Sequence, residues 1–80
     1  MSKAGHSKLE ICIDVLIELK NQGPSKITSI MSQSYLTSNV LTEYLEFLVK
    51  QGTVEESTVN DEIVVFAITK KGVNVLKYFR

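Results

Sequence analysis

The sequence has little of several residue types on which common classes of protein depend. Its 80 residues include one cysteine, one histidine, one proline and no tryptophan. The single thiol, Cys12, excludes an internal disulfide and a zinc site built from several thiolates, and it fits a reducing compartment. No stretch of about 18 apolar residues occurs, and residues 1–8 contain no apolar segment of the kind that a signal peptide needs. We therefore expect a cytoplasmic protein that does not contact a membrane.

An excess of charge of either sign is also absent. Nine Lys and Arg residues balance nine Asp and Glu residues. This balance excludes a general attraction to nucleic acid or anionic lipid, so a polyanionic partner has to be bound by a local patch. The length predicts one domain over residues 7–80, preceded by a flexible arm at residues 1–6. A core of this size is small, which favours a homodimer.

Residues 8–22 are predicted to form the first helix. Ser7 and Glu10 have the spacing of a capping box at its start. Apolar residues recur at steps of three and four and form one stripe, made of Leu9, Cys12, Ile13, Leu16 and Leu19. Ile11, Val15 and Ile17 lie off this stripe. The helix is therefore expected to face two partners.

The rest of the chain predicts three further helices and a hairpin. In chain order these are a short helix capped by Ser25, a longer helix between Thr37 and Gly52, strands at 54–57 and 63–68, and a last helix capped by Thr69. The strands have to lay their apolar face against the helices, which gives an α+β domain. The second and third helices have the layout of a helix-turn-helix, and the hairpin has the place of a wing.

Three motif pieces occur in a fixed order. They are Leu36-Thr37, then Leu41-x-x-Tyr44-Leu45-x-Phe47-Leu48-x-x-x-Gly52-x-Val54-Glu55, and Ile68-Thr69-x-Lys71-Gly72-x-x-x-Leu76. In these residues the chain resembles the small archaeal winged-helix proteins of crenarchaeal chromosomes, plasmids and viruses. The resemblance covers nearly the whole chain from Lys8. It implies a winged helix-turn-helix fold with three helices, a two-stranded wing and a C-terminal helix, and the function of a homodimeric DNA-binding transcriptional regulator.

The exposed side of the third helix carries side chains suited to reading DNA. Ser38, Asn39 and Thr42 are predicted to contact bases in the major groove of double-stranded DNA. Asn pairs with adenine, while Ser and Thr hydrogen-bond in either direction or touch the thymine methyl group. The residues predicted to contact phosphate, through a positive charge or through a helix start, are Lys26, Ser25, Thr37, Lys3 and Lys8.

Carboxylates are concentrated in the predicted wing. Between Val54 and Ile63 there are four acidic residues and no basic one, namely Glu55, Glu56, Asp61 and Glu62. Glu43 and Glu46 add two carboxylates to the third helix. Carboxylates that face phosphates weaken binding to DNA. The alternative hypothesis is therefore a winged-helix module that binds a protein partner through its acidic wing and does not bind DNA.

The surplus apolar residues of the first and last helices predict a dimer interface. Its expected members are Ile11, Val15, Val75 and Tyr78. For each of them, burial in the core of its own domain is the alternative. That alternative is favoured for Leu76 and Phe79, whereas the interface is favoured for Ile11 and Val15.

No constellation for catalysis or metal binding is recognised in the sequence. His6 lies in the predicted arm, and Cys12 lies on an apolar stripe, where a thiol is normally inert. Glu55 and Glu56 are adjacent and point to opposite faces of a strand, so they do not act as a pair. We expect a protein that is not an enzyme and that has no cofactor and no metal.

Overall fold

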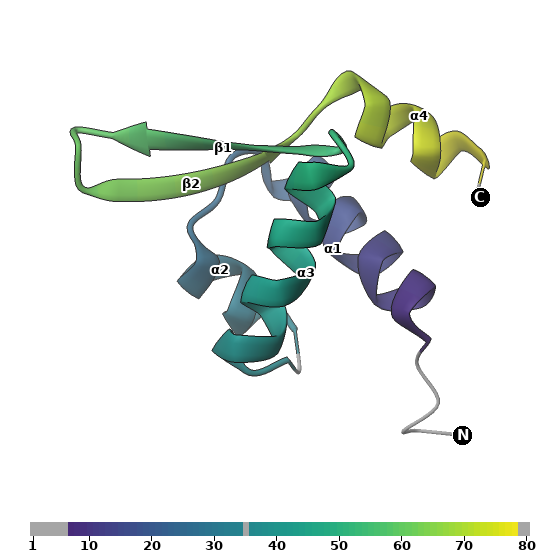
Figure 1. Ribbon diagram of the computed structural model, residues 1–80, viewed down its shortest axis with the longest axis horizontal. Helices are drawn as coiled ribbons and strands as arrows, with labels where there is room; N and C mark the ends of the chain where they lie inside the picture. The colour runs from purple at the N-terminus through teal and green to yellow at the C-terminus, as the bar shows by residue number, and fades with distance from the viewer. Residues whose placement is uncertain (1–6, 35, 79–80) are drawn as a thin grey trace.

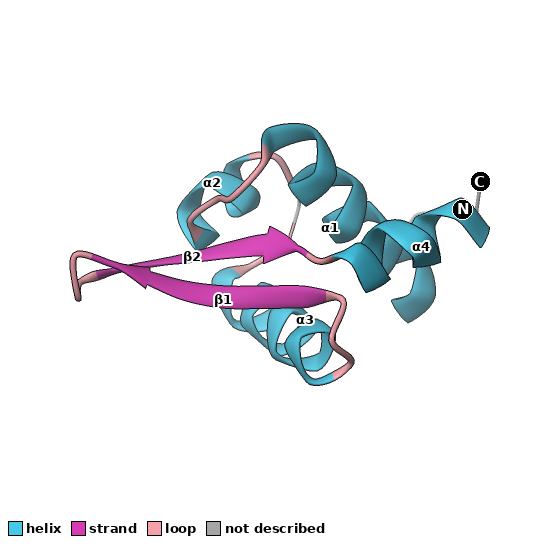
Figure 2. Ribbon diagram, turned by 90° about the horizontal axis from the view of Figure 1, so that it is seen from above, coloured by secondary structure: helices cyan, strands magenta, loops and turns pink. Residues whose placement is uncertain are grey.

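The computed structural model describes residues 7–34 and 36–78, and it confirms the predicted order of elements (Figure 1). The elements are α1 (Lys8–Gln22), α2 (Ile27–Ser32), α3 (Ser38–Lys50), β1 (Val54–Val59), β2 (Ile63–Ile68) and α4 (Lys70–Tyr78). β1 and β2 pair antiparallel and form the wing. In Figure 2 the strands run between α4 at one end and the free tip of the wing at the other. The predicted α+β class is confirmed, while the predicted arm at residues 1–6 lies outside the described residues.

Local sequence signals place the helix ends. The Ser7 N–H donates to Glu10 Oε1 (2.9 Å) and the Glu10 N–H donates to Ser7 Oγ (3.1 Å), which is the predicted capping box. At the start of α3 the Thr37 hydroxyl accepts from the Val40 N–H (3.4 Å). Gly23 ends α1 with a positive φ of 79°, a conformation that favours glycine. These signals lie within four residues of each helix end, which is why they were readable in the sequence.

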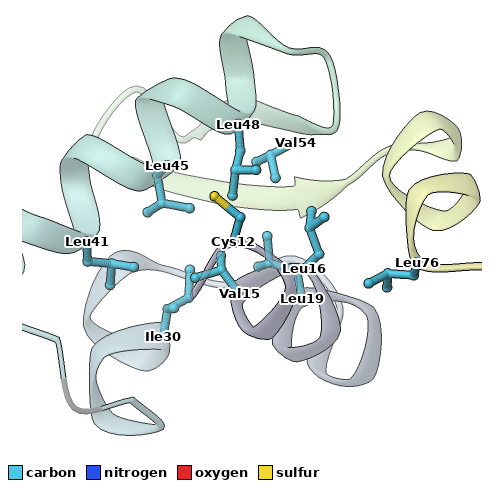
Figure 3. Packing of buried hydrophobic residues seen from close by; sticks show 10 residues of the cluster. All are labelled: Cys12, Val15, Leu16, Leu19, Ile30, Leu41, Leu45, Leu48, Val54 and Leu76. Carbon is cyan, nitrogen blue, oxygen red and sulfur yellow. The ribbon is translucent and has the colours of Figure 1, made fainter. Parts of the chain in front are cut away.

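The core lies between α1 and α3, and α2, β1 and α4 close it (Figure 3). Its buried apolar residues are Cys12, Val15, Leu16, Leu19, Ile30, Leu41, Leu45, Leu48, Val54 and Leu76. Two residues of α1 depart from the predicted stripe. Leu9, expected in the core, is 53 % exposed, and Val15, expected off the stripe, is 3 % exposed. α1 contacts α2, β2 and α4, so its buried side is set by these neighbours and is wider than a single stripe.

A hydrogen-bond network fixes the base of the wing to α3 and α4. The Thr53 hydroxyl donates to Leu48 O (3.0 Å), and the Thr69 N–H donates to Thr53 O (3.0 Å). The Thr69 hydroxyl donates to Gly52 O (2.6 Å) and accepts from the Gly72 N–H (3.2 Å). Thr69 therefore caps α4 as predicted, and it also ties α4 to the end of α3.

The wing is longer than the sequence predicted. β1 continues to Val59, two residues beyond the expected end, and pairs there with Ile63. Asn60 and Asp61 both have positive φ, and the Glu62 N–H donates to Val59 O (3.2 Å), as in a type I′ turn. Asn and Asp tolerate this conformation, so a tight turn replaces the longer polar loop. None of the described helices reaches the length and apolarity of a membrane span.

Candidate nucleic-acid interface

The three residues predicted to read bases lie together at the start of α3. Ser38, Asn39 and Thr42 are all exposed, while Leu41 and Leu45 anchor the opposite face of the helix in the core. Figure 1 places this end of α3 on the side of the molecule away from α4. The first amide groups of a helix have no acceptor within the helix, so this end also presents N–H donors to an anion.

The hydroxyl of Thr42 is already engaged within α3. It donates to Ser38 O at 2.7 Å. Its proton is therefore not available to a base, while the methyl group and an oxygen lone pair remain on an exposed side chain. Of the two roles that the sequence left open for Thr42, this geometry favours contact with a methyl group over donation of a hydrogen bond.

The start of α2 differs from the prediction. The N-cap is Lys26, which is exposed and makes no side-chain capping bond. The predicted capping role of Ser25 is wrong, because its hydroxyl donates to Gly23 O (2.9 Å) and not to an α2 amide, while its phosphate contact stays a prediction. The Ser25 N–H donates to Phe66 O (2.9 Å), and the Phe66 N–H donates to Ser25 O (2.8 Å). Ser25 thus joins the segment before α2 to β2 and has a structural role.

The two described lysines that are predicted to contact phosphate border different hollows. Lys26 borders a hollow beside α2 and β2, together with Ser29 and Val65. Lys8 borders a different hollow, between α1 and α3. Lys3 lies outside the described residues. The structure therefore places Lys26 and the start of α3 on the helix-turn-helix unit formed by α2 and α3. Lys8 belongs to α1 and borders the hollow between α1 and α3.

The wing is acidic and apolar on its surface. Its four carboxylates, on Glu55, Glu56, Asp61 and Glu62, are all exposed. Adjacent Glu55 and Glu56 pair with Ala67 and Phe66, so they point to opposite faces of the hairpin. At its tip Val59, Ile63 and Val64 are exposed. Val59 was predicted to lie in a polar loop, whereas Ile63 and Val64 were predicted to belong to a strand whose apolar face packs against the helices. The wing surface repels phosphate and offers an apolar tip.

One residue of the predicted dimer interface is ruled out. Val15 is buried in the core of its own domain, so its assignment to an interface is wrong. Ile11 and Val75 are half-buried, and Tyr78 is 87 % exposed. Phe79 lies outside the described residues. Leu9 and Phe47 are also exposed, and neither was predicted to belong to an interface. The helical period already indicated that Phe47 lies off the face of α3 formed by Leu41, Leu45 and Leu48.

The single cysteine, Cys12, is buried in the core. Burial raises the pKa of Cys12, which keeps the sulfur in its unreactive protonated form at neutral pH. Among residues 7–34 and 36–78, no group of three His, Cys, Asp or Glu side chains is arranged to hold a metal ion.

Comparison with known proteins identifies the family. Residues 6–80 match the family described as winged helix-turn-helix. The chain belongs to the winged helix-turn-helix family. No curated protein matches it. The predicted fold is therefore confirmed, with β1 and β2 as the wing of the winged helix and α2 and α3 as its helix-turn-helix.

Solved structures share this winged-helix fold at low sequence identity. A ZitR variant from Lactococcus lactis has a TM-score of 0.80 and 20 % identity, over 99 % of this chain and 55 % of that chain. BpsR from Bordetella bronchiseptica, whose DNA binding is regulated by 6-hydroxynicotinic acid, has a TM-score of 0.81 and 16 % identity, over 85 % and 50 %. A probable transcriptional regulator from Pseudomonas aeruginosa has a TM-score of 0.79 and 17 % identity, over 86 % and 54 %. The chain spans about half the length of these relatives.

Proposed function

We propose that this winged-helix protein binds double-stranded DNA as a homodimeric transcriptional regulator and places α3 in the major groove. The observation that carries the proposal is the exposed polar start of α3, where Ser38, Asn39 and Thr42 lie in the first turns of the helix, beside its first amide groups. The regulators from Bordetella bronchiseptica and Pseudomonas aeruginosa, which share the fold, support it. The protein acts by binding and not by catalysis, and its archaeal type and cytoplasmic location stay predictions.

Phosphate contacts are expected from a small number of groups. Lys26 is exposed at the start of α2, and the Thr37 cap fixes the first amide groups of α3. Lys8 makes a phosphate contact only if the DNA backbone reaches the hollow between α1 and α3. Because the chain has no net charge, its attraction to DNA depends on these few contacts. A dimer doubles their number. The acidic wing is expected to lie away from phosphate.

Substitutions at Lys26 and Asn39 are expected to have different effects on DNA binding. Anisotropy titrations with fluorescent duplexes, selected from a random pool and unselected, should give an affinity that falls steeply with salt. Lys26→Ala should weaken binding to every duplex and flatten the salt dependence, because it removes a phosphate contact. Asn39→Ala should cost about 1 to 3 kcal/mol on the selected duplex and little on the others.

The control for these variants is Lys77→Ala, which removes a charge from exposed α4 far from the start of α3. It should leave affinity and salt dependence close to those of the parent. If Lys26→Ala and Asn39→Ala also behave like the parent, the docking face is wrong. If no duplex binds even at low salt, the proposed function is wrong and the protein-binding alternative, supported by the acidic wing with its apolar tip, takes its place.

Thr42 is expected to read a thymine methyl group. Thr42→Val keeps a methyl group and removes the hydroxyl, whereas Thr42→Ser keeps the hydroxyl and removes the methyl. Because the hydroxyl proton is held by Ser38 O, Thr42→Val should bind the selected duplex like the parent. Thr42→Ser should bind roughly fourfold more weakly, because it loses the free energy of burying one methyl group. Replacing the contacted thymine by uracil should weaken the parent but not Thr42→Ser. Equal uracil effects in both proteins would contradict this role.

A further inference from the structure

An exposed apolar surface lies where the start of α1 meets one flank of α3. Leu9 is 53 % exposed, Phe47 is 51 % exposed and Val40 is 38 % exposed. Val40 and Phe47 are seven residues apart, so they lie on the same flank of α3. Single exposed apolar residues are normal on a protein surface, but a contiguous group marks a contact with another molecule.

Two adjoining hollows make this surface continuous. One, of about 340 Å³, lies between Lys8 of α1 and Val40, Glu43 and Phe47 of α3. The other, of about 380 Å³, also borders Lys8 and Phe47, and it extends past Leu9 to Val75 of α4. We call the region formed by Leu9, Val40, Phe47 and Val75, with Lys8 and Glu43 beside it, the α1–α3 surface. Val75 is a member of the interface predicted from the sequence.

The charges beside this surface indicate what covers it. Lys8 and Glu43 border the same hollow, and Lys71 borders the second hollow near α4. A nucleic acid would meet the carboxylate of Glu43 and the apolar side chains. Because Lys8, Lys71 and Glu43 present both signs of charge, a partner that also carries both signs complements this surface. In a two-fold interface the same patch meets itself, so a positive and a negative residue on one copy face their opposites on the other.

We propose that a second copy of this chain covers the α1–α3 surface. Leu9 and Phe47 of the two copies pack together, and Lys8 of each copy pairs with Glu43 of the partner subunit. The inference rests on the homodimer in the proposed function and gives it a location, in place of the buried Val15. Thr42 lies about 140° around α3 from Phe47 and Asn39 about 80° from it, so both predicted base-reading residues lie off the flank that carries Phe47.

Charge reversal tests the predicted pair. Sedimentation velocity between 5 and 200 µM should show that the parent dimerises. Lys8→Glu and Glu43→Lys alone each place like charges opposite one another twice per dimer, so each should raise the dissociation constant roughly tenfold. The double variant restores both pairs and should return to within about threefold of the parent. The control pair, Lys77→Glu and Glu56→Lys, lies away from this surface and should change nothing.

Phe47→Asp and Leu9→Glu test the apolar part. Both residues are half exposed in the single chain, so thermal unfolding of a dilute sample should change little, while the dimer should be lost at all concentrations used. A parent that stays monomeric at 200 µM overturns the proposal, as does a dimer that tolerates Phe47→Asp or is not rescued by the charge exchange. A dimer that binds no duplex overturns the DNA-binding proposal alone.

Discussion

Gly72→Ala is expected to lower the free energy of unfolding by about 2 to 3 kcal/mol. A Cβ atom at position 72 would overlap the carbonyl oxygen of Thr53 and would lie 2.6 Å from Ile68 Cγ1. The Thr53 oxygen belongs to the backbone and accepts from the Thr69 N–H, so it cannot move without loss of that bond. The first turn of α4 would have to shift away from the base of the wing. Urea unfolding followed by circular dichroism measures the change.

The sign of this effect distinguishes packing from helix propensity. In an open helix, replacing glycine by alanine stabilises by about 1 kcal/mol, because alanine has the better helix propensity. Asn74→Ala, at an exposed position of the same helix, is the matched control and should stabilise slightly or have no effect. If Gly72→Ala also leaves stability unchanged or raises it, then α4 does not pack against the start of β1 as closely as described.

Val15→Glu is expected to unfold the domain and not merely to separate a dimer. The side chain of Val15 is 3 % exposed and lies in the core near Ile30 (Figure 3). A carboxylate at this position would be buried without a partner, at a cost of about 3 to 5 kcal/mol. That is a large part of the stability of a domain of this size. Far-ultraviolet circular dichroism should show loss of helix at room temperature or a much lower Tm.

Leu9→Glu is the control for Val15→Glu, since both introduce the same charge into α1. Leu9 is half exposed, so the variant should keep the parent's helix content and Tm when it is dilute. A folded Val15→Glu protein that becomes monomeric would restore Val15 to the interface and contradict the described core. The pair therefore separates a residue that holds the domain together from one that contacts a second molecule.

The element order and the helix ends other than the start of α2 were predicted correctly because their causes are local. The capping box of Ser7 and Glu10, the cap at Thr37 and the cap at Thr69 each join residues three positions apart. The change from a helical period to an apolar run likewise located the hairpin. The exposure of Ser38, Asn39 and Thr42 followed from the same period, since the opposite face of α3 carries the leucines.

The errors concern contacts between distant parts of the chain. The stripe on α1 was assigned from spacing alone, which exchanged Leu9 and Val15, because spacing does not tell how many elements pack against a helix. Ser25 has the residue type of an N-cap but is paired with Phe66, which is far away in the sequence. The turn at Asn60 and Asp61 was predicted too long because the pairing of Val59 with Ile63 depends on the opposite strand.

The sequence by itself determined the kinds and order of the elements, the caps of α1, α3 and α4 and the polar residues at the start of α3, since each depends on side chains within about one helical turn. Only the tertiary structure decided that Val15 is core, that Ser25 is structural and that Leu9 and Phe47 border one surface. The physical reason is that burial depends on which elements meet, and elements far apart in the chain meet here through packing that no local pattern encodes.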